Sequence, residues 1–301
     1  MSEIPEQPSA SQHPVPLRCP HCRQTLQAIF HEDAVPPRLR GVRCPAGHRF
    51  DAARQGYVNL LVGRPSKFTP DTAEMIMARE RVQSGGVFSP LTAALRGLLA
   101  GTEPAVFLDC GAGTGYYLHD LLAQRPESQG IALDLSPAGL KRAAKHPRST
   151  ALAWDLWQPL PLADDGVDVL LNVFAPRNPE EYARVLRPGG VAVVVIPGPG
   201  HLAELAQRGL LKQQQDKREQ VVAQMRPHFG PPEENVHLQH TRPVSVQEAA
   251  DLIFMGPAGH HGTLAAIREE IDSHEELTQV SLELDILLWR KQPLGEHPPN
   301  G

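Results

Sequence analysis

Three glycines at alternate positions, Gly111, Gly113 and Gly115, follow an apolar run that ends at Asp109. The run AVFLD is typical of a buried strand, and the segment YYLHDLLAQ after the glycines is typical of a helix. A turn without side chains between these elements lets backbone approach a bound polar ligand. No lysine follows the glycines, so the stretch lacks the G-x-x-x-x-G-K-[ST] pattern of a phosphate-binding loop.

Beyond the glycine turn, the sequence continues to alternate apolar strands with helices. The strands GIALDLS, STALAWD, VDVLLNVFA and VAVVVIPGPG are largely apolar, and helical segments such as PAGLKRAAKHP separate them. This pattern predicts an α/β fold whose parallel sheet is covered by helices on both faces. In such a sheet, ligands bind outside the carboxyl ends of the strands. The last apolar run, VSLELDILLWR, is expected to add an antiparallel edge strand.

Acidic residues follow the next two strands at positions that suit a nucleoside ligand. Asp134 lies nineteen residues after Gly115, and Asp155 follows the third strand. The turn P-G-G at 188–190 comes next. With Asp109, the form D-x-G-x-G-x-G resembles motif I of the class I (Rossmann-like) S-adenosylmethionine methyltransferases. The resemblance implies S-adenosylmethionine as the cofactor, with Asp134 at the ribose hydroxyls and Asp155 at the adenine amino group.

Two short pairs of metal-binding side chains lie in the first fifty residues. The motif C-P-H-C is followed, after twenty-one residues, by C-P-A-G-H. Two such pairs on separate loops are what a closed tetrahedral zinc site requires. The predicted zinc ligands are Cys19, Cys22, Cys44 and His48. His21 and His31 are rival ligands without this spacing, and Cys110 is expected to be a small buried residue.

Charge is distributed unevenly along the chain. Residues 1–67 contain nine basic and five acidic side chains, whereas the whole chain has a net charge of −5. A basic module on an acidic remainder indicates contact with a polyanion such as RNA. The basic side chains expected at that contact are Arg38, Arg40, Arg43, Arg49, Arg54, Arg64 and Lys67. No apolar run is long enough to cross a membrane and no signal peptide is visible, so a cytoplasmic protein is expected.

Five segments are expected along the chain. They are a disordered tail at 1–16, a zinc-binding RNA-recognition domain at 17–60, a linker with two leading helices at 61–104, a methyltransferase domain at 105–291 and a second disordered tail at 292–301. The tails are assigned from their proline and polar content. The first leading helix, DTAEMIMARERVQSGG, is predicted to be capped by Asp71, with Glu74 three residues later.

Several longer motifs together resemble one family. They are C-P-H-C with C-P-A-G-H, FDAARQGYVNLL, DTAEMIMAR, LDCGAGTGYYL, LNVFAPRNPEE, LRPGG, PGPGHLAEL and the MGP that begins at Met255. The chain resembles the RlmA family of 23S ribosomal RNA guanine-N1 methyltransferases from about residue 17 to the last strand. The segment N-V-F-A-P-R-N-P most resembles the RlmA(II) branch, which includes tylosin-resistance methyltransferases of the TlrB type.

The resemblance implies a zinc-ribbon-like domain on a class I methyltransferase domain. The substrate would be a guanine in a stem-loop of 23S RNA near the peptide exit tunnel, and the methyl group would go to N1. Cofactor contacts of the family match Phe88, Tyr117, Leu118 and His201, where Phe88 departs from the tyrosine of relatives. After MGP this chain has AGHHGTL, so His260 or His261 would replace an aromatic residue that would stack on the base.

Guanine N1 carries a proton at neutral pH, which must pass to a positioned base or to water. The segment LNVFAPRNP offers Asn172 as a residue that orients the base edge, Phe174 beside it, and the turn Ala175–Pro176 as a wall of the slot. Asparagine is not a base, so the general base stays unassigned. His201 has three readings, as a helix cap, a cofactor contact or a base, and cofactor contact is favoured.

Two other functions remain open at this point. One is a methyltransferase of the same fold that acts on a small molecule or a protein, and the other is a zinc-stabilised RNA-binding protein without activity. The basic zinc module argues against a small-molecule or protein substrate. The complete glycine turn with Asp109 and Asp134 argues against an inactive RNA-binding protein. Which guanine is modified, whether the protein forms a homodimer, and whether modification confers macrolide resistance are left open.

Overall fold

The computed structural model describes residues 15–31, 38–63, 66–272 and 279–293. The two tails predicted from composition lie outside the described residues except at 15–16 and 292–293. At the end of the first tail the backbone is held, because the amide of Ala163 donates a hydrogen bond of 2.7 Å to the carbonyl of Pro16. In the described part of the chain, no helix has the length and apolar character needed to span a bilayer.

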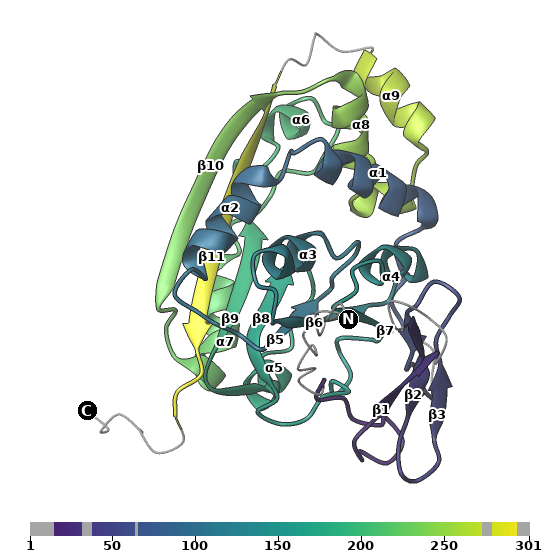
Figure 1. Ribbon diagram of the computed structural model, residues 1–301. Helices are drawn as coiled ribbons and strands as arrows, with labels where there is room; N and C mark the ends of the chain where they lie inside the picture. Colours follow the sequence, from purple (N-terminus) through teal and green to yellow (C-terminus); the bar gives the residue numbers. More distant parts are fainter. Residues whose placement is uncertain (1–14, 32–37, 64–65, 273–278, 294–301) are drawn as a thin grey trace, which may run out of the picture.

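An eight-stranded sheet forms the centre of the described residues (Figure 1). Its strands, in spatial order, are β10 (Glu234–Pro243), β11 (Gln279–Arg290), β9 (Leu186–Pro197), β8 (Val167–Val173), β5 (Val106–Cys110), β6 (Gln129–Asp134), β7 (Ser149–Ala153) and β4 (Val58–Asn59). The strands from β9 to β4 pair in parallel, and β10 and β11 are antiparallel additions. The predicted parallel sheet is therefore confirmed, whereas β11 is covered by β10 and is no edge strand.

Successive side chains of the sheet enter two separate cores. Phe107, Val169 and Leu171 face one core, and Leu108 and Leu170, their neighbours in sequence, face the other. This alternation follows from the two-residue period of a strand. Because both faces are buried, the strands read as continuous apolar runs, as the sequence predicted.

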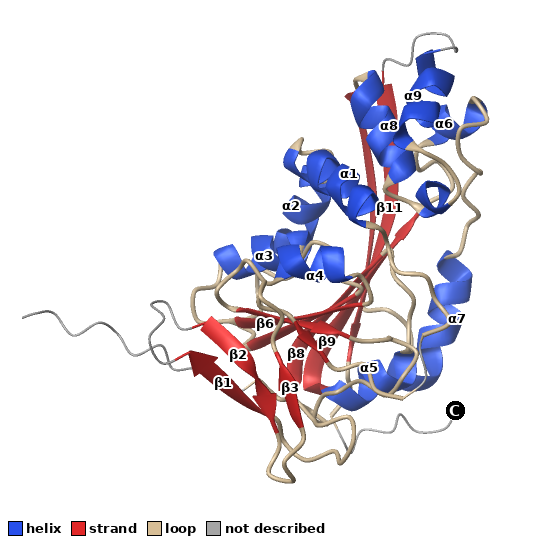
Figure 2. Cartoon of the chain, turned by 90° about the vertical axis from the view of Figure 1, so that its right-hand side faces the viewer, coloured by secondary structure: helices blue, strands red, loops and turns tan. Residues whose placement is uncertain are grey.

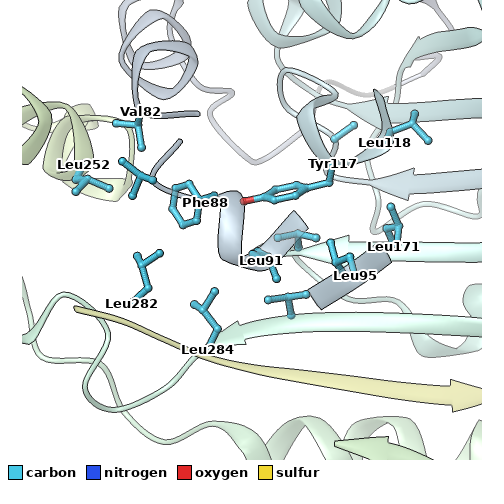
Figure 3. Close-up of a cluster of buried hydrophobic side chains, with 14 of the residues drawn as sticks. Val82, Phe88, Leu91, Leu95, Tyr117, Leu118, Leu171, Leu252, Leu282 and Leu284 are labelled. Carbon is cyan, nitrogen blue, oxygen red and sulfur yellow. The ribbon is translucent and has the colours of Figure 1, made fainter. Parts of the chain in front are cut away.

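Several helices pack against the first core of the sheet. These are α1 (Ala73–Ser84), α2 (Ser89–Leu98), α3 (Tyr116–Ala123), α4 (Pro137–Ala143), α8 (Val246–Phe254) and α9 (Leu264–Asp272). Figure 2 shows α1 to α4 on one side of the sheet and α5 (Pro179–Val185) and α7 (Arg218–Phe229) on the other. Figure 3 shows side chains of the first core, where Phe88 and Tyr117 point toward one another.

The first helix begins one residue later than predicted. Thr72 is its N-cap, and the Thr72 side chain accepts a hydrogen bond from the amide of Met75. Thr72 is one of the residue types favoured at this position. The carboxylate of Asp71 is thereby left to pair with Arg79 at 2.6 Å.

A small three-stranded antiparallel sheet precedes the large one. It is built from β1 (Gln27–His31), β2 (Arg38–Arg43) and β3 (Arg49–Asp51). The chain then enters β4, whose Val58 and Asn59 pair in parallel with Leu152 and Ala153 of β7. The N-terminal module therefore supplies the last strand of the large sheet, and it shares the second core through residues such as Leu17 and Leu60.

Candidate functional site

The four predicted zinc ligands converge on one point. The ligand atoms of Cys19, Cys22, Cys44 and His48 all lie within 4.8 Å of one another. The Cys22 and Cys44 sulfurs are 3.6 Å apart, and His48 Nδ1 lies 3.3 Å from the Cys44 sulfur. Sulfur atoms around a tetrahedral zinc, with Zn–S bonds of about 2.3 Å, are separated by about 3.8 Å. The donor set and its spacing therefore fit a structural Zn²⁺ ion.

Two tight turns present these side chains. In the first, the amide of Arg23 donates to the carbonyl of Cys19 at 2.8 Å, and in the second, the amide of Gly47 donates to the carbonyl of Cys44 at 3.0 Å. Gly47 has a φ of +89°, which a glycine adopts without strain. The rival ligand His21 is exposed and lies against the His48 ring, with centroids 4.9 Å apart.

The Cys44 thiol already has the chemistry of a metal ligand. Burial raises its pKa, but hydrogen bonds from Cys22 and His48 outweigh burial and lower the pKa to about 6. Thiolate is the form of cysteine that binds metal. The module therefore gains a negative charge at the point where Zn²⁺ would neutralise it.

The turn between β5 and α3 leaves no room for a side chain at Gly111 or Gly115. A β-carbon on Gly111 would lie 2.4 Å from the β-carbon of Ala175, and Gly111 has a φ of +85°. The amides of Gly111 and Ala112 both donate to the carbonyl of Leu133, which fixes the turn to the end of β6. The turn therefore lies at the carboxyl edge of the sheet, where the sequence predicted a ligand.

Two carboxyl groups lie beneath this turn. Asp134 accepts hydrogen bonds of 2.7 Å from the amides of Gly113 and Ser136, and burial raises its pKa. Asp109 is buried, and its Oδ2 has no hydrogen-bond partner among the described residues. Burial, with a smaller contribution from the charge of Asp134, raises the pKa of Asp109 to about 7. A cationic ligand would favour the charged form of both carboxyl groups.

Arg79 of α1 is a site residue that the sequence analysis missed. Its Nη2 donates to the carbonyl of Met255 at 2.7 Å and pairs with Asp71 at 2.6 Å. Its Nη1 lies 3.0 Å from the position that a β-carbon on Gly113 would take. Arg79 also lowers the pKa of Asp134, against the larger effect of burial. The motif DTAEMIMAR ends on this arginine, and that was the signal available in the sequence.

Three aromatic rings line the edge next to the glycine turn. Phe174, directly after β8, has a φ of +55° and is 40% exposed. Its ring lies 5.9 Å from that of Phe88 and 6.0 Å from that of His201, and it stacks on His201. A left-handed φ is unusual for a phenylalanine, and such strain is concentrated at functional sites. The exposed ring forms a flat surface beside the cofactor turn.

His201 lies behind this surface as a neutral imidazole. Burial lowers its pKa to about 4, and its Nδ1 has no hydrogen-bond partner in the described part of the chain. Its amide donates to the carbonyl of Gly198, so the backbone is held in the turn after β9. An unpartnered acceptor or donor inside a site is available to a ligand.

The other residues singled out from the sequence are buried or lie away from the carboxyl edge. Tyr117 and Leu118 are buried in the first turn of α3, and burial raises the pKa of Tyr117 above its usual value. Asp155 is buried and accepts a hydrogen bond of 3.1 Å from the amide of Trp157.

The P-G-G turn at 188–190 lies within β9, at the start of that strand, and is therefore remote from the carboxyl edge. Cys110 is fully buried, as predicted.

Asn172 lies beneath the Ala175–Pro176 turn. Its side chain is buried, and its amide nitrogen donates to the carbonyl of Pro176 at 2.8 Å and the hydroxyl of Tyr182 at 3.0 Å. In this arrangement the amide nitrogen of Asn172 supports the turn that carries Phe174, while its Oδ1 is buried without a hydrogen-bond partner among the described residues. Its role in orienting the base edge stays a prediction.

The two histidines after MGP differ in position. His260 Nε2 lies 3.5 Å from Asp71, next to the Arg79 pair, and His261 is exposed. The predicted basic contacts that are exposed are Arg40, Arg43, Arg49, Arg54 and Lys67. Arg49 is paired with Asp51 at 2.8 Å. Arg64 and the Arg38 side chain lie outside the described residues.

Comparison with known proteins identifies both parts of the chain. Residues 17–64 match the family described as "RlmA, N-terminal", and residues 107–190 match the family described as "Methyltransferase domain". The Streptomyces fradiae 23S rRNA (guanine(748)-N(1))-methyltransferase is 38% identical, over 92% of this chain and 97% of its own length. A Micromonospora griseorubida protein assigned to 23S rRNA guanine-N1 methylation is 42% identical, over 91% of this chain and 97% of its own length.

Proposed function

The chain belongs to the family of the 23S rRNA (guanine-N1)-methyltransferases, and we propose that it transfers a methyl group from S-adenosylmethionine to N1 of a guanine in a stem-loop of 23S ribosomal RNA. One combination of features carries the proposal. The same chain has a Cys₃His cluster on a basic module and a complete glycine turn at the carboxyl edge of the sheet. The protein would act in the cytoplasm, where ribosomal RNA is made.

The residues around the glycine turn suit the charges of the cofactor. When bound, S-adenosylmethionine supplies a methyl group on a sulfonium centre. Asp134 would accept hydrogen bonds from the ribose hydroxyls, and Asp155 would contact the adenine amino group. Arg79 would bind the carboxylate of the methionine part, because its Nη1 faces Gly113 while Asp71 and Met255 hold its Nη2. Buried Asp109 balances the positive charges of the ligand.

The exposed ring of Phe174 would hold the guanine. Aromatic side chains stack on unpaired RNA bases, and Phe174 lies at the carboxyl end of β8, beside the strand that leads into the glycine turn. The rings of Phe88 and His201 pack against it, with centroids 5.9 and 6.0 Å from that of Phe174. Fixing the base close to the methyl donor converts a bimolecular reaction into one within a complex, which is a large part of catalysis.

The proton on guanine N1 must leave during the reaction. A base that is paired by Watson–Crick hydrogen bonds has its N1 blocked, so the enzyme acts on an exposed guanine or extrudes one. Asp109 lies beneath the turn and is buried, so it is assigned to the cofactor. His201 is neutral at pH 7 because burial lowers its pKa, and it is assigned to a cofactor contact, the role that the family resemblance implies.

The experiment that tests this function is methyl transfer from tritiated cofactor to 23S RNA transcribed without modifications. Parallel reactions contain protein extract and metabolite extract, which test the two other substrate classes. Mass spectrometry of the digested RNA should give 1-methylguanosine, and primer extension should stop one nucleotide before a single guanine. Label on N7, N2 or a ribose oxygen would contradict the N1 assignment, and label only in protein or metabolites would contradict RNA as the substrate.

A further inference from the structure

An exposed pair of aromatic rings lies next to Asp155. Phe68 is 49% exposed and Trp157 is 51% exposed, and their rings stack with centroids 6.1 Å apart and an interplanar angle of 23°. Both backbones are fixed locally, since the Phe68 amide donates to Ser66 Oγ and the Trp157 amide donates to the carboxylate of Asp155. Large apolar surface held open to solvent in this way marks an interaction site.

The position of the pair connects the two modules. Phe68 lies in the connector that runs from β4, the strand supplied by the zinc module, to α1, which covers the glycine turn. Trp157 follows β7 at the same edge of the sheet at which Phe174 follows β8. Only β5 and β6 separate β7 from β8, so the two loops are about three strand spacings, or about 14 Å, apart.

We propose that Phe68 and Trp157 form a stacking platform for an unpaired base of the RNA substrate, a few nucleotides from the guanine that is methylated. This inference rests on the proposed function. Every base has a π-face, so stacking on an aromatic platform tolerates any sequence. Exposed Lys67 is adjacent in sequence to Phe68 and lies where the basic segment ends, so a phosphate near the base would meet positive charge.

The competing occupant is the adenine of the cofactor, because Trp157 is bonded to Asp155. The two possibilities are distinguished by measuring the affinities for RNA and for S-adenosylmethionine on the same variants. Trp157→Ala and Phe68→Ala should raise the KM for transcribed 23S RNA about 5- to 150-fold, the range expected for one stacked base. The Kd for S-adenosylmethionine should stay within twofold, and Trp157→Phe should restore most of the RNA affinity.

Fluorescence gives a second readout that is independent of activity. The chain has three tryptophans, and Trp154 and Trp289 are buried, so Trp157 is the exposed one. A 12-nucleotide oligoadenylate should quench the emission of the wild type, and Trp157→Phe should remove this quenching. Val236→Ala, an exposed apolar position on the far edge strand β10, is the matched control and should change neither measurement.

The inference is overturned if the Trp157→Ala variant methylates 23S RNA with an unchanged KM. It is also overturned if this variant loses affinity for the cofactor by the same factor as for RNA. The proposed function fails separately, if the wild type itself places no methyl group on 23S RNA.

Discussion

Arg79 lies across the glycine turn, with its Nη1 3.0 Å from the position that a β-carbon on Gly113 would occupy. The other terminal nitrogen is held by Asp71 and by the carbonyl of Met255. The guanidinium is thus oriented by the connector before α1 and by the segment after α8. A planar cation with one end fixed is well suited to bind a carboxylate.

Arg79→Met should weaken binding of S-adenosylmethionine at least tenfold, because a charge-assisted hydrogen bond is worth about 1.5–3 kcal/mol. Decarboxylated S-adenosylmethionine lacks the group that Arg79 would bind, so its Kd should change little in the same variant. Isothermal titration measures both. Arg81→Met on the same helix breaks the pair with buried Asp251 and should lower the Tm while leaving the ratio of the two affinities unchanged. Equal losses for both ligands in Arg79→Met would assign Arg79 a purely structural role.

Asp134→Ala should raise the Kd for the cofactor by tenfold or more, since the ribose would lose hydrogen bonds to a charged acceptor. The variant also loses the bonds from Gly113 and Ser136, so the turn should become less ordered. Asp134→Asn keeps one oxygen acceptor and should show a smaller loss. Circular dichroism checks that both variants fold. A Kd equal to that of the wild type in Asp134→Ala would make this carboxylate dispensable for the ribose.

One zinc ion per chain is expected in the purified protein, bound by Cys19, Cys22, Cys44 and His48. Cys44→Ser should lower the zinc content measured by atomic emission and increase hydrogen exchange in residues 17–60, because metal binding and folding are coupled. Cys110→Ser, at a buried cysteine outside the cluster, should retain the metal. Protein that is free of metal yet protected from exchange in this segment would disprove the zinc site.

Stability should decrease as the pH rises through the pKa of Asp109. Its pKa in the folded protein is about 7, above the ordinary value of 3.8, so the folded state holds the proton more tightly than the unfolded state. This contribution to stability is complete below about pH 3.8 and is lost as the pH rises through about 7. Asp109→Asn, which stays neutral, should gain Tm relative to the cofactor-free wild type between pH 5 and pH 8. If the Tm difference between the Asp109→Asn variant and the wild type is the same at every pH in this range, Asp109 does not titrate there.

Charge reversal on the zinc module should weaken RNA binding without affecting the cofactor. Arg40→Glu and Arg43→Glu alter exposed side chains of β2, and each should reduce the slope of log affinity against log salt by about one. Arg218→Glu, exposed on α7, is the control for total charge. Filter binding with transcribed 23S RNA at several salt concentrations measures the slope. Deletion of residues 1–60 is unsuitable because it removes β4 from the large sheet.

Sequence reasoning succeeded where a function depends on residues close together in the chain. The zinc pairs and the glycine turn are local patterns, and the apolar strands report burial on both faces of the sheet. It failed for β10, whose sequence ENVHLQHTRP is largely exposed and pairs with a strand some forty residues later. Arg79 and the Phe68–Trp157 pair were missed for a similar reason, since contacts of Arg79 span up to 176 residues. Asn172 was predicted from its place at a strand end and its orienting role stays a prediction, although its amide nitrogen is also bonded to Tyr182, a contact that its place at the strand end does not indicate.

The pairing of β4 with β7 imposes an order on biosynthesis. The zinc module leaves the ribosome early, but the partner of β4 begins only at Ser149. A nascent chain therefore carries an open strand edge until β5, β6 and β7 have been made and the sheet reaches it. Such edges promote wrong association, and late pairing over long separations slows folding. Capture of the metal by the emerging N-terminus would hold that edge in a folded module while the rest of the enzyme is synthesised.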